Sequence, residues 1–167
     1  MGYARAFTRS VLAAYLFVLL WLVLFKFSAD PLSVIASYQA RSLNLIPFAD
    51  SSLSDMRDNF LAFFVLGLLL GINDRSRGFL RKVALVTLLS LAVEGLQYAL
   101  AIGAADITDV LMNSLGAAAG LALTDLAHKY LGHGNAARIL DLVVTAFVAA
   151  LLLAFLWLRT FVFQVRY

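Results

Sequence analysis

The sequence contains no cysteine and little charge. The absence of cysteine from its 167 residues excludes disulfides, thiolate metal ligands and a cysteine nucleophile. Charged residues make up 14% of the chain, whereas a soluble domain carries about 25%. The net charge is +3, and no run of lysine and arginine indicates a nucleic-acid surface. We therefore expect no nucleic-acid partner.

Several catalytic motifs are also missing. The chain has no Gly-x-Ser-x-Gly nucleophile turn, no P-loop, no His-Glu-x-x-His zinc motif and no dinucleotide fingerprint. The two histidines, His128 and His133, lack the carboxylate or cysteine support of a metal site, so we interpret them as polar loop residues. Any chemistry would have to depend on carboxylates.

Most residues of the chain are apolar. It is 63% apolar, with a mean hydropathy of +0.91, and a membrane-spanning helix needs about 20 mostly apolar residues. The composition predicts an all-α membrane protein with residues 1–167 in a single domain. We expect a bundle of five transmembrane helices with a long extracytoplasmic loop between the first and the second. The predicted spans are residues 11–27, 55–72, 83–102, 107–127 and 139–158.

The second span is short for a membrane helix. Only Phe60 to Ile72 is continuously apolar, and thirteen residues cover roughly 20 Å of a hydrocarbon core of about 30 Å. Asp55, Asp58 and Asn59 must then lie near the membrane or be shielded by neighbouring helices. This places polar groups of the second helix at a depth similar to Glu94 of the third.

The long loop and the distribution of basic residues give an orientation. Asp30-Pro31 predicts the start of a short helix over residues 30–39, either interfacial or re-entrant, and Pro47 predicts a bend. Eight lysines and arginines lie in the N-terminal segment and in the loops after the second and fourth spans, against five elsewhere. The positive-inside rule then predicts a cytoplasmic N-terminus and an external polar stretch.

A cluster of polar residues forms the candidate site. Glu94 and Gln97 share one face of the third helix, and Asp106, Asp109 and Asn113 share one face of the fourth. At 1.5 Å per residue, Glu94 and Asn113 both lie roughly 12 Å from the outer ends of their helices. We expect these side chains to meet at one depth with the polar start of the second helix, and a carboxylate there needs a donor or must be neutral.

Structural roles explain part of this cluster. Asp106 is suited to cap the fourth helix, and an acidic residue also suits the positive end of a helix dipole. Gln97 and Asn113 are typical interhelical hydrogen-bonding residues. Gly116 and Gly120 predict close helix packing, as do Gly67 and Gly71, and Gly71 is also a candidate helix C-cap. Near the cytoplasmic boundary, Asp125 and Asp141 are expected to pair with Lys129 or Arg138.

The motifs together resemble a known family. Asn44-Leu45-Ile46-Pro47-Phe48, Asp58-Asn59, Glu94-x-x-Gln97 and Asp106-x-x-Asp109-x-x-x-Asn113-x-x-Gly116-x-x-x-Gly120 are similar, in this order, to the VanZ-like membrane proteins. The similarity covers residues 43–123. Many relatives place an arginine shortly before the first aspartate, where this chain has Gly103-Ala104-Ala105. Another cation, such as Arg57 or Arg41, would have to substitute, or the site has changed.

The resemblance implies a multi-pass protein of the bacterial inner membrane, linked to low-level resistance to the glycopeptide teicoplanin. Two functions follow as hypotheses. In the first, an outward-facing pocket binds membrane lipids or lipid-linked, anionic envelope precursors, using Asn44, Asn59, Glu94, Gln97, Asp106, Asp109 and Asn113. In the second, Glu94 and Asp109 are catalytic carboxylates of an intramembrane enzyme that acts on an envelope lipid or glycan carrier.

The sequence also gives expectations about cofactors and about transport. We expect no dedicated cofactor, although oxygen ligands of this kind suit Mg²⁺ or Ca²⁺. Transport of an ion or solute is disfavoured because few charges continue through to the cytoplasmic side.

Overall fold

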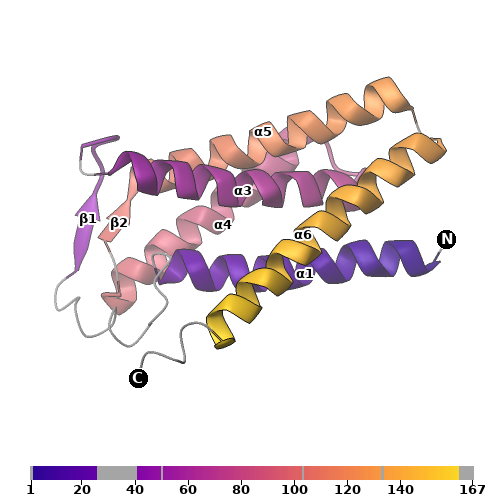
Figure 1. The fold of residues 1–167 in the computed structure, drawn as a ribbon. Coiled ribbons are helices and arrows are strands. Elements are labelled where there is room, and N and C mark those ends of the chain that lie inside the picture. The colour runs from indigo at the N-terminus through magenta and orange to yellow at the C-terminus, as the bar shows by residue number, and fades with distance from the viewer. Residues whose placement is uncertain (1, 26–40, 50, 103, 133, 162–167) are drawn as a thin grey trace.

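The structure is a computed structural model that describes residues 2–25, 41–49, 51–102, 104–132 and 134–161. Within these residues, five helices alternate in direction along the bundle shown in Figure 1: α1 (Gly2–Leu24), α3 (Leu53–Asn73), α4 (Phe79–Leu100), α5 (Ile107–Leu131) and α6 (Asn135–Phe161). The N-terminus and the α3–α4 and α5–α6 connections lie at one end, called the basic end below. The predicted short helix at residues 30–39 falls outside the described residues.

Four of the helices are long and apolar enough to cross a membrane, namely α1, α4, α5 and α6. The chain is therefore a multi-pass membrane protein. The second predicted span, residues 55–72, corresponds to α3, which is not one of these four among the described helices. Its first two turns carry Asp55, Arg57 and Asp58, so the apolar part of the helix is short.

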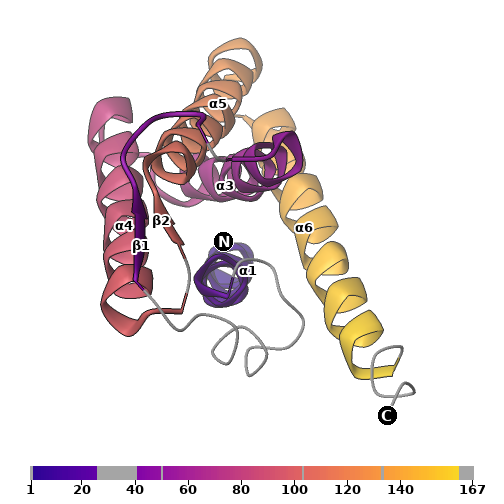
Figure 2. The same cartoon turned by 90° about the vertical axis from the view of Figure 1, so that its left-hand side faces the viewer.

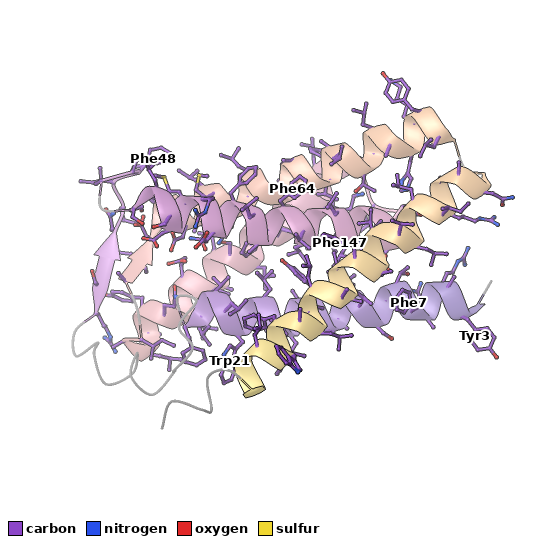
Figure 3. The ribbon with its side chains drawn as sticks, in the orientation of Figure 1. Tyr3, Phe7, Trp21, Phe48, Phe64 and Phe147 are labelled. Atoms are coloured by element: carbon purple, nitrogen blue, oxygen red, sulfur yellow. The ribbon has the colours of Figure 1, made fainter. Side chains whose placement is uncertain are left out.

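Apolar side chains lie on the surface and polar side chains lie in the interior, as in a protein surrounded by hydrocarbon. Large apolar side chains are exposed along the helices, as Figure 3 shows for Phe7 and Phe147. Polar side chains are buried between helices, including Ser90, Gln97 and Asn113. Lipid is as apolar as leucine, so helix association depends on close packing and on interhelical hydrogen bonds.

Close packing is strongest between α3 and α5. A Cβ atom added to Gly116 would lie 2.2 Å from the carbonyl oxygen of Phe60, and one added to Gly120 would lie 2.1 Å from that of Phe64. Gly67 of α3 has the same relation to Ala117, at 2.3 Å. The prediction of close packing at the Gly-x-x-x-Gly motif is therefore confirmed, with α3 as the partner helix.

Of the two roles predicted for Gly71, close packing is confirmed and the helix cap is wrong. Helix α3 continues to Asn73, and Asp74 caps it. A Cβ atom at Gly71 would lie 2.6 Å from the Cβ of Thr124. Gly71 therefore has a packing role against α5, because the absence of a side chain lets the two helices approach.

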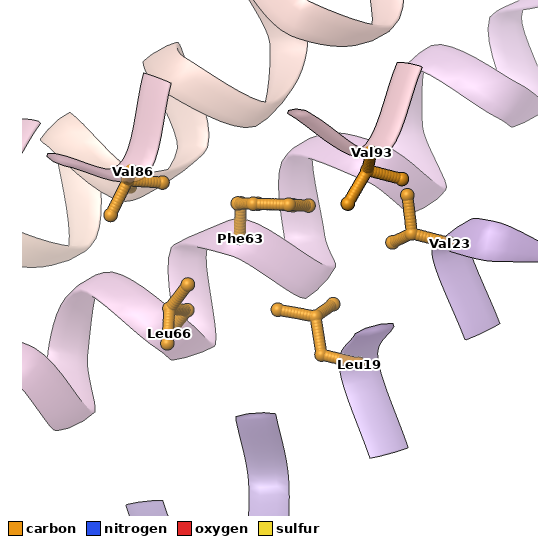
Figure 4. Close-up of a cluster of buried hydrophobic side chains, with 7 residues drawn as sticks. Leu19, Val23, Phe63, Leu66, Val86 and Val93 are labelled. Atoms are coloured by element: carbon orange, nitrogen blue, oxygen red, sulfur yellow. The ribbon is translucent and has the colours of Figure 1, made fainter. Parts of the chain in front are cut away.

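Helix α1 packs against α3 and α4 through an apolar cluster. Figure 4 shows Leu19 and Val23 of α1 meeting Phe63 and Leu66 of α3, with Val86 and Val93 of α4. The hydroxyl of Tyr15 donates a hydrogen bond of 2.7 Å to the carbonyl oxygen of Ala62. Figure 2 shows α4 and α6 on opposite sides of the bundle, with α1 and α3 between them.

A short parallel strand pair lies at the other end of the bundle, called the strand end below. It pairs β1 (Ser42–Asn44) with β2 (Ala104–Asp106), and Asn44 is opposite Asp106 in the register. The all-α prediction did not include these strands. Residues 46–49 then form the turn predicted at Pro47, closed by a hydrogen bond from the Ala49 N–H to the Ile46 carbonyl.

Candidate binding site

Asp106 is the centre of the polar residues at the strand end. It caps α5 as predicted, because its Oδ1 accepts a hydrogen bond of 2.8 Å from the Thr108 N–H. Its Oδ2 accepts hydrogen bonds from Ser51 Oγ at 2.7 Å and from Asn44 Nδ2 at 3.3 Å. Burial alone would raise the pKa of Asp106, but these hydrogen bonds outweigh it and lower the pKa below its ordinary value.

Glu94 reaches Asp106 from α4. The Oε2 of Glu94 accepts a hydrogen bond of 2.8 Å from the backbone N–H of Asp106, and the side chain is buried. Glu94 therefore connects α4 to β2, immediately before α5 begins. We predicted that Glu94 meets Asp109 and Asn113, and the structure shows it bound to the backbone N–H of Asp106 at the start of α5.

Asn59 and Asp109 form a second hydrogen-bonded pair. Asn59 Nδ2 donates a hydrogen bond of 2.7 Å to Asp109 Oδ1, and both side chains are buried between α3 and α5. The expected approach of the second helix to Asp109 is confirmed for Asn59. Asp55 is exposed and Asp58 binds Arg57, so the other two polar residues of that turn do not take part.

Asn113 binds a partner that was not predicted. Its Nδ2 donates a hydrogen bond of 2.8 Å to Ser90 Oγ, which joins α5 to α4. Ser90, Glu94 and Gln97 follow one another at i, i+4 and i+7, so the helical period already placed Ser90 on the polar face of α4. That spacing was the signal that could have identified it.

Gln97 points away from the other polar residues. It is 0% exposed, and its Nε2 donates to the carbonyl oxygens of Val23 at 3.0 Å and Leu24 at 3.3 Å. These carbonyls lie in the last turn of α1, where a helix generally leaves its carbonyl groups without an intrahelical partner. Gln97 thus stabilises the end of α1, and the prediction that it meets Asp109 and Asn113 is wrong.

A pocket of about 220 Å³ opens between β1, α4 and α5. We call it the strand-end pocket. Glu94 and Asp106 are its two acidic lining residues, and Tyr98 and Gly95 lie on the α4 side. The other lining residues are apolar: Leu43, Leu45, Leu91, Ala105, Ile107 and Val110. The site therefore combines an apolar surface with two carboxylates.

One cation lies beside this pocket. The guanidinium carbon of Arg41 is 5.8 Å from the ring centroid of Tyr98, within the range of a cation–π interaction. Arg57, the other candidate to replace the missing arginine, is bound to Asp58 through a nitrogen–oxygen distance of 2.8 Å. Arg41 is therefore the better placed of the two.

The two candidate catalytic carboxylates do not share this site. Glu94 lines the strand-end pocket, whereas Asp109 does not and is bound to Asn59. Among the described residues, no group of three histidine, aspartate or glutamate side chains is arranged to hold a metal ion.

The basic end contains a second polar cluster, and its ion pairs differ from those predicted from the sequence. Asp141 of α6 binds Arg75 at 2.5 Å and His128 at 2.7 Å. Asp125 lies 3.9 Å from Lys82. The predicted partners Lys129 and Arg138 were therefore wrong, and His128 is a buried residue of α5. His133 lies outside the described residues.

Comparison with known proteins identifies the family. The family model described as VanZ/LLP1 matches residues 12–128. Protein VanZ from Enterococcus faecium is 44% identical to the chain over 153 residues, which are 91% of each protein. No solved structure matches the chain. The matched residues include every element that builds the strand-end pocket, and the chain belongs to the VanZ/LLP1 family.

Proposed function

We propose that the strand-end pocket binds an amphipathic component of the bacterial envelope, a lipid or a lipid-linked precursor, at the outer face of the inner membrane. Binding there would change what the cell surface exposes and so reduce susceptibility to a glycopeptide such as teicoplanin. The observation that carries the proposal is the pocket itself: a largely apolar cavity with Glu94 and Asp106 in its wall.

The lining residues match the two parts of such a ligand. The side chains of Leu91, Ile107 and Val110 offer an apolar surface for a hydrocarbon chain. The carboxylates of Glu94 and Asp106 in the pocket wall can accept hydrogen bonds from a ligand. They suit a hydroxyl or amine of the headgroup, while Arg41 beside Tyr98 suits a phosphate.

The remaining predicted site residues support the pocket without lining it. Asn44 holds β1 to Asp106, and Asn59 with Asp109 holds α3 to α5. Asn113 and Gln97 join α4 to α5 and α1. We propose that these residues position the pocket, and that Glu94 and Asp106 contact the ligand.

Gly95 offers a direct test. A Cβ atom at this position would meet no heavy atom within 4 Å, and the residue lines the pocket. Gly95→Leu should fill the cavity while Gly95→Ala should leave it open, and both should raise helix propensity. In a susceptible host, we expect Gly95→Leu to return the teicoplanin inhibitory concentration to that of empty vector, with Gly95→Ala at the wild-type value. Equal resistance from both variants, at equal membrane abundance, would refute the proposal.

An enzyme acting on an envelope lipid is the alternative, favoured by the carboxylate of Glu94 in the pocket wall. Glu94→Gln separates the two functions because it removes ionisation but retains an oxygen that accepts the Asp106 N–H. A binding protein should keep resistance within about threefold, a change below 1 kcal/mol. An enzyme using Glu94 as acid or base should lose activity by at least about a hundredfold. Asp109→Asn, which lies outside the pocket, is the matched control.

A further inference from the structure

A second pocket lies at the basic end, far from the strand end. Its volume is about 370 Å³, and it is formed by the α3–α4 connection, the first turn of α4 and the last turns of α5. We call it the basic pocket. Four of its lining residues are cationic: Arg75, Arg77, Lys82 and Lys129. Asp125 is the one carboxylate among its described lining residues.

Lys82 is a buried cation with hydrogen-bonding capacity to spare. Its side chain is 5% exposed, and its ammonium group has three donors. One donor binds the carbonyl oxygen of Asp74 at 3.2 Å. The nearest carboxylate, Asp125, is 3.9 Å away and its side chain is 48% exposed, which is too distant for a hydrogen bond. These two contacts compensate the buried charge of Lys82 only in part, so an additional anion would stabilise it.

The other cations of the pocket also retain donors. Arg75 binds Asp141 and His128 through one nitrogen, Nη2, and Arg77 binds Asp74 through Nη1. A guanidinium has five N–H donors, so each arginine has further donors after these contacts. Lys129 forms no ion pair with any residue that the structure describes. The four cations carry four positive charges, and their carboxylate neighbours Asp74, Asp125 and Asp141 carry three negative charges. One positive charge therefore remains.

The backbone adds further donors. Gly78 caps α4 without a side-chain hydrogen bond, and the first turn of this helix contains no acidic residue. Its first N–H groups thus border the pocket at Gly78 and Phe79, where the helix dipole is positive. Helices α3 and α5 end near the pocket, and the negative ends of their dipoles oppose anion binding there. At the end of α3, however, the Asp74 carbonyl is already bound by Lys82.

Exposed apolar side chains surround the basic pocket. Leu80 of α4 and Tyr130 of α5 are each 79% exposed, and Leu126 is 49% exposed. A membrane would cover such side chains, and this places the pocket at headgroup depth beside acyl chains. Basic pockets between membrane helices are known to hold phosphate-bearing headgroups.

We propose that the basic pocket binds the phosphate group of an anionic phospholipid headgroup, with Lys82 and Lys129 as its main cationic contacts. This site is independent of the strand-end pocket and of the function proposed for it. It would fix the depth of the basic end in the membrane, where α3, α4, α5 and α6 meet.

The test compares lipid retention by charge variants. The full chain is released from nanodiscs of equal phosphatidylglycerol and phosphatidylcholine, and bound lipid is measured by native mass spectrometry. Each basic contact is expected to be worth about a fivefold change in retention. Lys82→Met and Lys129→Gln should each lower retained phosphatidylglycerol by about that factor. Arg81→Gln removes the same charge from α4 outside the pocket and should leave retention at the wild-type value.

The outcomes separate the possibilities. Lys129 is exposed, so its variant tests the pocket even if Lys82→Met fails to fold. Inorganic phosphate that raises the unfolding temperature of the wild type, but not of Lys129→Gln, supports the phosphate site and shows that acyl chains are dispensable. Retention that falls equally in Arg81→Gln, or in none of the three variants, overturns the proposal.

Discussion

Asp106 joins three parts of the strand end through a single side chain. It binds Thr108 at the start of α5, Ser51 before α3 and Asn44 in β1. Loss of a helix cap costs about 0.5–2 kcal/mol, and the lost interhelical contacts add to this. We expect Asp106→Ala to lower the free energy of unfolding by about 2 kcal/mol, measured by thermal unfolding in detergent. Asp55→Ala removes an exposed carboxylate of α3 and should cost less than about 1 kcal/mol; an equal loss would contradict the account.

The lowered pKa of Asp106 also predicts a pH dependence. Because the folded-state pKa lies below the unfolded one, the carboxylate contributes stability that is complete above the unfolded pKa. This contribution is lost as the pH falls through the folded-state pKa. The difference in unfolding temperature between wild type and Asp106→Asn should therefore be largest near neutral pH and should shrink in acid. A difference that stays constant down to about pH 2 would contradict the assignment.

Single residues also show what a sequence can and cannot reveal. The cap at Asp106 was predictable because capping depends on neighbours along the chain. The direction of Gln97 was not, since Val23 and Leu24 lie more than seventy positions away and one helix face can meet several helices. The ordered motif brought Asn44 and Asp106 into one candidate site, but Ser51 carries no pattern that separates it from other loop serines.

At the scale of the element, the α3–α5 contact limits which side chains the chain tolerates. Gly120→Ala would place a methyl group 2.1 Å from a backbone carbonyl oxygen, so the helices would have to separate. We expect Gly116→Ala and Gly120→Ala each to destabilise the fold by about 1–3 kcal/mol, as overpacking does. The measurement is again thermal unfolding in detergent.

Gly95→Ala provides the control for this prediction. A methyl group there meets no neighbour, and alanine favours helix by about 1 kcal/mol over glycine. Its unfolding temperature should equal or exceed that of the wild type. Wild-type stability in Gly120→Ala would show that α3 and α5 are not in close contact at this point.

Other elements differ in how far their sequence determines them. The helices follow from long apolar segments. Helix α4 ends at Leu100 and not at residue 102 as predicted, because Ala101 adopts a left-handed conformation. The strands β1 and β2 were missed because each has three residues and their pairing joins segments about sixty positions apart. Such short strands have no periodicity that distinguishes them from loop.

For the whole molecule, the orientation in the membrane is the main prediction that follows from charge. The chain has no cysteine, so a single introduced cysteine reports only its own position. Ser54→Cys at the strand end should react with a membrane-impermeant maleimide on intact cells. Asn135→Cys at the basic end should react only after the membrane is permeabilised. The opposite pattern would place the strand-end pocket in the cytoplasm and contradict the proposed function.

The architecture as a whole was largely predictable, but the role of α3 was not. Hydropathy identifies α1, α4, α5 and α6, whose outer surfaces are apolar. Helix α3 contributes Asn59, Phe63 and the glycine contact to the interior, so its sequence reflects neighbouring helices as much as lipid. Composition along one segment does not reveal which neighbours will surround it.

The central claim is that the strand-end pocket holds an envelope lipid. Native mass spectrometry of the full chain, purified from its membrane in wild-type, Gly95→Ala and Gly95→Leu forms, tests it most directly. The account predicts a co-purifying lipid or lipid-linked species in the first two forms and at least a tenfold lower occupancy in Gly95→Leu, equivalent to about 1.4 kcal/mol. Equal occupancy in all three forms, or no bound species in any of them, would contradict it.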